Sequence, residues 1–220
     1  PEETLVLTEN AQPALMAVSM AVMRVLAEEG NFSLADKSAF VAGHALGEYA
    51  ALAAASAISL GDAARLLKLR GQSMQKAVPV GVGAMAAILG PELDAVRDIA
   101  AEAAAGDVCD VGNDNAPGQV VLSGDKAAVE RAVEIATDQG VRRCIMLPVS
   151  APFHCALMKP AADVMEKALG DIELKAPVVP VVANVTAEAV RDPAVIRELL
   201  VRQVTEMVRW RECVLYMKDQ

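Results

Sequence analysis

The feature that most constrains the fold is an internal repeat in the middle of the chain. "MAAILGPELDAVRDIAAEAAAGDV", residues 85–108, can be laid over "QVVLSGDKAAVERAVEIATDQGV", residues 119–141. Each copy has a short apolar run, then a glycine (Gly90 or Gly124), then an amphipathic helix pattern that ends at a second glycine. The repeat predicts β-α-β twice, the ferredoxin-like split β-α-β pattern, with elements at about 84–89, 93–105, 108–113, 119–123, 126–138 and 142–147.

The segments on either side of the repeat show α/β patterning. A helix is predicted over 12–29, with Pro13 in its first turn and Gly30 as its stop. A strand at 39–42 and an Ala-rich helix from about Leu46 follow, then a helix over 59–78 with Asp62 as its N-cap. Beyond the repeat we expect helices at 155–169, 193–204 and 208–218, and an edge or short strand within 178–185, where Pro180 donates no ladder hydrogen bond.

These elements predict a single α/β domain that carries an insertion. We expect an α/β core of residues 1–82 and 149–220 and a ferredoxin-like (βαββαβ) small subdomain of residues 83–148. Hydrophobic residues make up 54% of the 220 residues and aromatic residues only 3%, so the core must be built from small aliphatic side chains.

Composition also excludes several classes of function. The net charge of −9 disfavours nonspecific binding to nucleic acid, which needs a basic surface. The four cysteines form no C-x-x-C pair and only two histidines are present, so we expect reduced thiols and no metal site. The most apolar run, 50–60, is too short to span a bilayer and no signal peptide is visible, so a cytoplasmic protein without a membrane partner is expected.

The stretch "GHALGEYAAL", residues 43–52, has the glycine spacing of a nucleophile elbow, G-x-S-x-G. A strand before it and a helix after it are the context that this motif requires. The middle position holds Ala45, which has neither a hydroxyl nor a thiol, while the backbone N–H of Leu46 would face developing negative charge at the helix start. Two glycines four residues apart are equally compatible with an ordinary helix start, so the spacing alone leaves both interpretations open.

Arg70 lies in the middle of an apolar helix face formed by Ala63, Leu66, Leu67, Met74 and Ala77. A cation in that position must reach solvent or meet an anion, because an unpaired buried charge is costly. One interpretation is a structural ion pair with an Asp or Glu. The other is a fork for a substrate carboxylate, which a guanidinium binds through two parallel hydrogen bonds.

His154 lies between a strand end and a helix start in "PVSAPFHCALM". It is a candidate general base or, alternatively, a packed and hydrogen-bonded residue. Cys155 is not expected to face it, because sequence neighbours rarely point toward each other, and His44 is expected to support the turn. Asn115 and Gln119 flank a Pro-Gly turn, where they serve either the turn itself or a ligand between the two subdomains.

Several stretches occur together, in this order, in one known family: "TENAQPALMAVSMAV", "AGHALGEYAAL", "LRGQSMQKAVPVGVGAMAAI", "NAPGQVVLSG", "LPVSAPFHCALMKPAA" and "VPVVANV". Over essentially all of its length the chain resembles the malonyl-CoA:acyl carrier protein transacylases, the acyltransferases of bacterial fatty-acid synthesis. The resemblance implies an α/β-hydrolase-like core with a ferredoxin-like insertion. It also implies malonyl-CoA and acyl carrier protein as substrate and partner, and no cofactor.

The resemblance assigns roles to particular residues. The nucleophilic serine of the family falls on Ala45, the catalytic histidine on His154, and the arginine that binds the malonyl carboxylate on Arg70. One oxyanion-hole N–H falls on Leu46. Met74, Asn115 and Phe153 are implied to line the acyl pocket, and Phe153 with Leu46 resembles malonyl rather than methylmalonyl selectivity.

Three departures from the family pattern are visible. The nucleophile is absent, as is the N-terminal G-Q-G-S-Q stretch whose glutamine N–H completes the oxyanion hole. The C-terminal portion, expected to supply the histidine's orienting partner and a G-P-G-K-like stretch, is also absent. We therefore expect an internal portion of the family domain.

The absent nucleophile decides what the chain is expected to do. Ping-pong acyl transfer needs a covalent step that Ala45 cannot make, so the chain is expected to be inactive. The alternatives are a noncatalytic module that binds a CoA thioester or carrier protein and, less well supported, an esterase or thioesterase. Arg142, Arg143, Lys76 and Lys159 are candidates for a local basic patch, although each also suits ordinary solvated surface.

Overall fold

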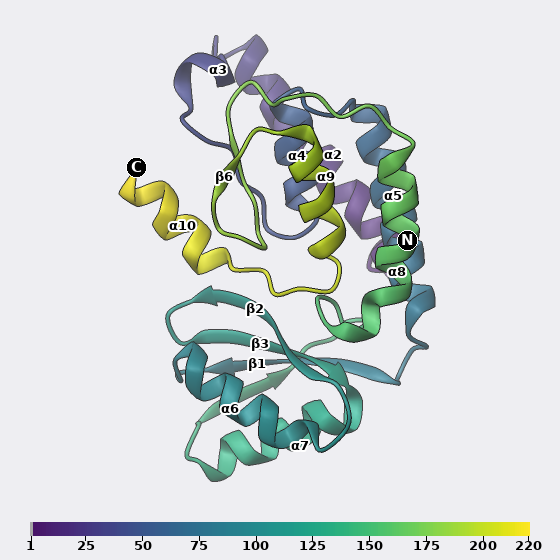
Figure 1. The fold of residues 1–220 in the computed structure, drawn as a ribbon, viewed down its shortest axis with the longest axis vertical. Helices are drawn as coiled ribbons and strands as arrows, with labels where there is room; N and C mark the ends of the chain where they lie inside the picture. Colours follow the sequence, from purple (N-terminus) through teal and green to yellow (C-terminus); the bar gives the residue numbers. More distant parts are fainter. Residues whose placement is uncertain (1) are drawn as a thin grey trace.

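The computed structural model describes residues 2–220, which form a mixed α/β fold with a small antiparallel sheet at one end (Figure 1). The helices are α1 (Glu2–Leu5), α2 (Thr8–Glu28), α3 (Leu34–Lys37), α4 (Gly47–Ala54), α5 (Leu60–Ala77), α6 (Leu93–Ala104), α7 (Lys126–Asp138), the 3₁₀ turn η1 (Ala156–Met158), α8 (Lys159–Gly170), α9 (Pro193–Arg202) and α10 (Trp210–Asp219). The strands are β1 (Gly83–Leu89), β2 (Cys109–Ala116), β3 (Gln119–Asp125), β4 (Arg143–Met146), β5 (Val181–Val182) and β6 (Ala189–Val190).

The repeat folds into one four-stranded sheet with the strand order β2-β3-β1-β4. β1 pairs antiparallel with β3 and with β4, and β2 pairs antiparallel with β3. Helices α6 and α7 lie on one side of this sheet (Figure 1), and their apolar faces share a buried cluster with the strands. The predicted order and type of all six elements are confirmed, although β2 continues to Ala116 rather than ending at 113.

Helix α2 begins at Thr8, earlier than predicted, so Pro13 lies inside the helix and the prediction of a first-turn proline is wrong. Packing explains the longer helix. A Cβ added at Gly71 of α5 would lie 2.4 Å from the Cα of Glu9, so the first turn of α2 lies directly against the α5 backbone. This tertiary contact stabilises a turn that the sequence pattern alone does not indicate.

The N-cap of α5 is Ser59, and the prediction of Asp62 is wrong. The hydroxyl oxygen of Ser59 accepts a hydrogen bond from the Asp62 N–H at 3.0 Å and donates to the Asp62 carboxylate at 2.6 Å. This reciprocal arrangement resembles a capping box, in which the acidic residue lies three positions inside the helix.

The strands predicted at 39–42 and 178–185 are much shorter in the structure. The first is reduced to an isolated parallel bridge between Val41 and Val181, and the second to the two residues of β5. Val41 donates to the Pro180 carbonyl and Val182 donates to the Val41 carbonyl, but Pro180 has no N–H with which to extend the ladder. The two segments nevertheless lie side by side and bring the turn at 43–47 next to residue 184.

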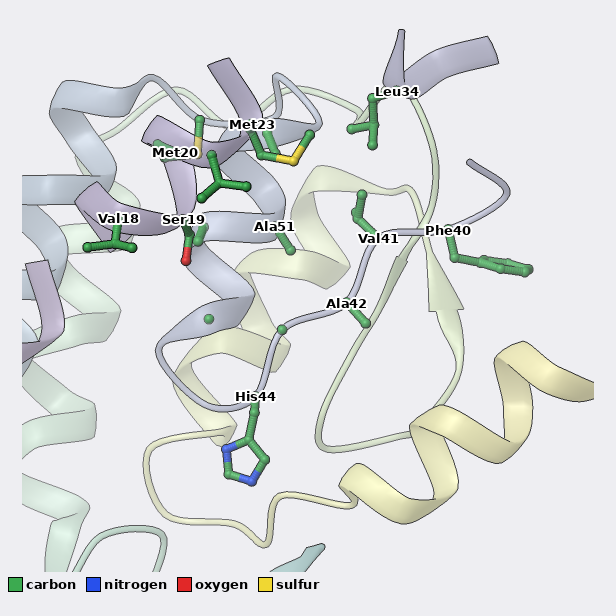
Figure 2. Close-up of a pocket in the computed structure, with 15 residues that line it drawn as sticks. Val18, Ser19, Met20, Met23, Leu34, Phe40, Val41, Ala42, His44 and Ala51 are labelled. Carbon is green, nitrogen blue, oxygen red and sulfur yellow. The ribbon is translucent and has the colours of Figure 1, made fainter. Parts of the chain in front are cut away.

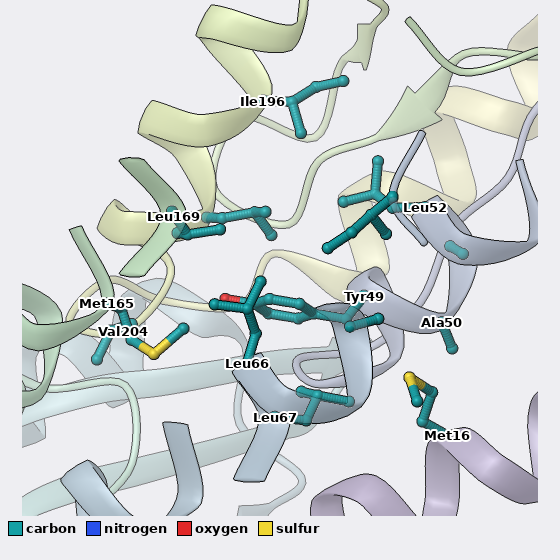
Figure 3. Packing of buried hydrophobic residues seen from close by; sticks show 14 of the residues in the cluster. Met16, Tyr49, Ala50, Leu52, Leu66, Leu67, Met165, Leu169, Ile196 and Val204 are labelled. Carbon is teal, nitrogen blue, oxygen red and sulfur yellow. The ribbon is translucent and has the colours of Figure 1, made fainter. Parts of the chain in front are cut away.

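The largest buried cluster joins α2, α4, α5, α8 and α9 (Figure 3). Tyr49 lies at its centre, surrounded by aliphatic side chains that include Leu52, Leu66, Leu169 and Ile196. The four-stranded sheet is linked to the rest of the chain by a backbone hydrogen bond, in which the Asp114 N–H donates to the Val208 carbonyl just before α10.

Within residues 2–220, no helix is both long and apolar enough to cross a membrane.

Candidate active site

The turn that holds Ala45 depends on a close backbone approach. A Cβ added at Gly43 would lie 2.0 Å from the carbonyl of Gly47, so position 43 has no room for a side chain. Ala45 adopts a left-handed conformation with φ of +51°, which is uncommon for a residue with a Cβ and is a feature of strained functional turns. Its N–H donates to the Asn184 side-chain oxygen at 2.7 Å, whereas the N–H of Leu46 has no acceptor among residues 2–220.

His154 is 5% exposed and also has a positive φ, +58°. Its Nδ1 lies 2.7 Å from the backbone carbonyl of Gln203. A carbonyl can only accept, so Nδ1 carries the proton and the Nε2 lone pair is left to act as a base. Burial, together with the positive charge of Arg70, lowers the pKa of His154 to about 3, so the ring is neutral near pH 7.

Gln203 is therefore the orienting partner of the histidine. The expectation that this partner is absent from the chain is wrong. Gln203 follows the last residue of α9 and is fully buried, and its carbonyl points back toward His154.

Arg70 is 2% exposed and makes no ion pair with any carboxylate among residues 2–220. Its two terminal nitrogens donate to amide oxygens, NH1 to Gln12 at 2.7 Å and NH2 to Gln203 at 3.0 Å. The guanidinium carbon lies 6.0 Å from the centre of the Tyr49 ring, and Nε has no partner. The structural ion pair considered from the sequence is thus not formed, and a buried cation is held by neutral groups.

Gln203 connects the three candidate residues. Its side-chain oxygen accepts from Arg70, its Nε2 donates to the Ala45 carbonyl at 3.1 Å, and its backbone carbonyl faces His154. Nε2 also donates to the Glu48 carboxylate at 2.8 Å. The structure thus brings together residues that lie far apart in the sequence and that sequence analysis selected for separate reasons.

Glu48 is a fully buried carboxylic acid in the first turn of α4. Its Oε2 accepts from the Asn184 backbone N–H at 3.1 Å and from Gln203. Burial raises the pKa of Glu48 to about 7, and the hydrogen bonds from Asn184 and Gln203 and the charge of Arg70 act in the opposite direction.

Ala45, Glu48, Arg70, His154 and Gln203 together are called the centre. The other predicted pocket residues lie around the centre in different ways. Met74 is fully buried on the same face of α5 as Arg70, and its sulfur accepts from the Gln12 amide at 3.7 Å. Phe153 is partly buried between the main cluster and the cluster of Met85, Ala87 and Val121 under the sheet. Asn115 does not reach the centre directly.

Asn115 instead pairs with His44, whose Nε2 lies 2.8 Å from the Asn115 side-chain oxygen. The His44 ring also meets the edge of Trp210 at 5.5 Å between ring centres. His44 is exposed, and it links the turn to β2 and α10. Its predicted supporting role at the turn agrees with these contacts.

Two cavities border the centre. One of about 650 Å³ lies between α2, α4 and residues 40–44 and is mostly apolar, and Figure 2 shows His44 at one end and Leu34 and Met23 at the other. The second, of about 470 Å³, has a mixed polar and apolar lining and reaches His154, and its charged lining residues include Asp110, Arg97 and Arg209. Arg70 lines neither cavity.

The Cys155 thiol donates to the Pro152 carbonyl at 3.2 Å, and burial raises its pKa to about 11, so it is not a thiolate near neutral pH. All four cysteines are free thiols. The basic candidates Arg142, Arg143, Lys76 and Lys159 are all exposed, and Lys159 forms an ion pair with Asp163.

Four residues whose amide and carboxylate groups hold the centre together were not predicted from the sequence: Gln12, Glu48, Asn184 and Gln203. Gln12 offered a signal, because it lies on the buried stripe of α2 between Thr8 and Met16. Glu48 offered a similar one, as an acid beside Tyr49 in an apolar helix. Polar residues inside an apolar pattern are expected to be hydrogen-bonded, and here they bond to one another.

Comparison with known proteins agrees with this geometry. The family model described as "Acyl transferase domain" matches residues 1–220, so the chain belongs to the acyl transferase domain family. Its relatives include the malonyl CoA-acyl carrier protein transacylases of Escherichia coli strain K12, 46% identical over 220 residues, and of Bacillus subtilis strain 168, 43% identical over 213 residues. The first match covers 100% of this chain and 70% of the relative, and the second covers 96% and 66%.

Solved structures are similar over the same extent. An acyl-carrier-protein-S-malonyltransferase from Bartonella henselae matches with a TM-score of 0.96 at 51% identity, covering 100% of this chain and 70% of that one. A malonyl-transacylase in complex with a type II polyketide acyl-carrier protein matches with a TM-score of 0.96 at 44% identity, again over 100% and 70%. Within the acyl transferase domain family, these relatives show that the chain belongs to the malonyl-CoA:acyl carrier protein transacylases as a family.

Proposed function

We propose that the centre around Gln203 is a malonyl-transfer site in which Ala45 occupies the position of the nucleophile. The observation that carries the proposal is that one residue, Gln203, touches the elbow at Ala45, the base at His154 and the cation at Arg70. An acyltransferase that acts on a dicarboxylic acyl group needs these three functions within reach of one thioester.

The proposed roles follow from the hydrogen-bonding state of each group. Nε2 of His154 takes the proton of a hydroxyl at position 45, because Nδ1 is already committed to Gln203. The N–H of Leu46, which has no protein acceptor, stabilises the oxyanion of the tetrahedral intermediate. Arg70 binds the free carboxylate of the malonyl group, and Met74, Phe153 and Asn115 line the acyl pocket.

In the complete reaction the hydroxyl attacks the malonyl thioester, coenzyme A leaves as a thiol, and the malonyl ester then passes to the pantetheine thiol of acyl carrier protein. Ala45 has no oxygen to form that ester. Loss of a serine nucleophile lowers kcat by about 10⁶-fold in a well-studied protease. The chain with Ala45 therefore binds malonyl-CoA without transferring its acyl group.

The proposal extends to the architecture and to the partner surface. Residues 83–148 are a ferredoxin-like subdomain, supported by the strand order β2-β3-β1-β4 and by a buried cluster drawn almost entirely from that segment. Residues 1–82 and 149–220 are an α/β-hydrolase-like core, supported by the strand-turn-helix context of Ala45. Arg142, Arg143, Lys76 and Lys159 are exposed candidates for contact with acyl carrier protein and with the phosphates of coenzyme A.

The test is malonyl transfer from malonyl-CoA to acyl carrier protein by the Ala45→Ser variant, in a chain extended by the flanking segments of the Escherichia coli relative. The unsubstituted chain, extended in the same way, is the matched control. We expect transfer by Ala45→Ser and none by the control. Release of free malonate instead of transfer would favour the thioesterase alternative. Tight binding with neither reaction would favour the noncatalytic binding module.

A further inference from the structure

Arg70 and Glu48 are a buried cation and a buried carboxylic acid in one polar cluster, yet they do not pair. A single amide lies between them: Gln203 accepts from Arg70 at 3.0 Å through Oε1 and donates to Glu48 at 2.8 Å through Nε2. The guanidinium has only donors, so the Gln203 oxygen must face it and the Gln203 NH₂ must face the carboxylate. The orientation of the amide is thereby fixed from both ends.

This arrangement leaves some of the guanidinium's donors without a protein partner, although the side chain is buried. A guanidinium has five N–H donors. Arg70 uses one toward Gln12 and one toward Gln203, and its Nε has no partner. A direct pair with Glu48 would bind the same donors bidentately and would compete with an incoming carboxylate. A buried cation without any counter-charge would, in turn, be costly.

We propose that Glu48 is a positioning residue that acts through Gln203, serving as the remote counter-charge of Arg70 while the amide keeps the two from pairing. The inference rests on the proposed role of Arg70 in binding the malonyl carboxylate. Gln203 is then a spacer whose length decides whether Arg70 faces the substrate or the protein's own acid. Gln203 also holds the His154 ring through its backbone carbonyl. A change at Glu48 that displaces Gln203 therefore affects both Arg70 and His154.

The experiment is isothermal titration of the 220-residue chain with malonyl-CoA and with acetyl-CoA, at about pH 8 so that Glu48, whose pKa is about 7, is charged. Acetyl-CoA lacks the free carboxylate, so the ratio of its Kd to that of malonyl-CoA isolates the contribution of Arg70. Glu48→Gln keeps the size and an acceptor oxygen but removes the charge. We expect it to raise the ratio by about tenfold, because the malonyl carboxylate no longer shares Arg70 with another anion.

Removing the spacer tests the opposite direction. In Gln203→Met the amide is gone but the backbone carbonyl that holds His154 remains. Arg70 then pairs with Glu48, and we expect the ratio to fall by about tenfold. The double variant with Glu48→Gln has no acid to capture Arg70, so its ratio should return to the wild-type value or exceed it. A merely structural role for Glu48 predicts no such reversal.

Two controls separate the possible failures. Glu28→Gln removes an exposed acid of α2 that pairs with Arg24, away from Arg70, and should leave the ratio unchanged. Arg70→Ala should bring the ratio close to one. If the wild type shows no preference for malonyl-CoA, the proposed function falls and this inference falls with it.

If Arg70→Ala abolishes the preference while Glu48→Gln fails to raise it, only the Glu48 role is overturned. The Glu48 role is also overturned if the double variant has a Kd ratio as low as that of Gln203→Met. Circular dichroism establishes that each variant is folded. If Glu48→Gln does not fold, the Gln203→Met variant decides the question. An unchanged Kd ratio in that variant would contradict the proposal that Gln203 keeps Arg70 and Glu48 apart.

Discussion

The two glycines of the turn that holds Ala45 have different surroundings and therefore different tolerances. At Gly43 an added Cβ would lie 2.0 Å from the Gly47 carbonyl, whereas at Gly47 it would meet nothing within 4 Å. We expect Gly43→Ala to lower the free energy of unfolding by about 3 kcal/mol, because backbone must move to admit it. Gly47→Ala should leave it unchanged or raise it by up to about 1 kcal/mol. Urea denaturation of both variants compares them, and equal losses would contradict the close approach.

A second prediction at the residue scale concerns pH. The pKa of His154 is about 3 in the folded chain and near 6.5 when unfolded, so below pH 6.5 the unfolded state takes up the proton first. This contribution to stability is complete above pH 6.5 and is lost as the pH falls toward 3. The free energy of unfolding should fall by up to about 1.4 kcal/mol per pH unit from this group alone.

Glu48 acts with the opposite sign. Its pKa is raised from 4.5 to about 7, so its contribution is present below pH 4.5 and is lost as the pH rises through 7. Urea titrations should therefore be made between about pH 4.5 and 6.5. As the pH falls through this range, the free energy of unfolding of His154→Gln should decrease less than that of the wild type, and that of Glu48→Gln should decrease more. Identical pH slopes in all three proteins would refute the burial of these two groups.

The candidate residues for chemistry could be predicted from the sequence, but the residues that hold them in place could not. Ala45, Arg70 and His154 were each visible because a motif, a cation on an apolar face or a junction made them unusual. Gln203 was not, since a glutamine after a helix end is an ordinary surface residue in most proteins. Its role depends on tertiary contacts with α4, α5 and residue 154, which no local pattern encodes.

At the scale of elements, β2 and α10 are joined by a buried ion pair between Asp114 and Arg211, whose Nε lies 2.9 Å from the carboxylate. Asp114 is 1% exposed and its second oxygen has no partner, so burial raises its pKa while Arg211 opposes that rise. This pair lies next to Asn115, which contacts His44 at the turn. The ion pair therefore stabilises the position of β2 relative to the candidate site.

We expect Arg211→Met to lower the free energy of unfolding by about 2 kcal/mol, because it leaves a buried carboxylate with too few partners. The matched control is Arg24→Met, which breaks the Arg24–Glu28 pair on α2, where both side chains are more than half exposed. That change should cost at most about 0.5 kcal/mol. Thermal denaturation that gives the two variants the same loss would contradict a structural role for the Asp114–Arg211 pair.

The elements that were predicted well are those with strong local signals. The repeat of 84–147 has alternating apolar strands, amphipathic helices and glycines with positive φ at Gly90, Gly106 and Gly140, and its order was predicted correctly. Helix α2 and the short strand β5 were predicted less well. Contact at Gly71 extends the former, and the missing N–H of Pro180 shortens the latter, so tertiary packing and ladder bonding set their bounds.

At the scale of the whole molecule, the mixed α/β fold and the family were both predictable, since the motifs extend over the full chain and the relatives match all of it. The match covers 70% of the Escherichia coli relative. The network around Gln203 lies entirely within the 220 residues, and it unites α4, α5, α9 and the segment before η1. We infer that this network surrounds an acyl-acceptor position at residue 45.

The most direct measurement is peptide mass mapping of the Ala45→Ser variant after brief exposure to malonyl-CoA. We predict a malonyl ester on the peptide that contains position 45, and its loss when Arg70→Ala is added. The unsubstituted chain should carry no adduct on that peptide. A malonyl group found at another position, or on the peptide of the unsubstituted chain to the same extent, would contradict the assignment of residue 45 as the nucleophile position.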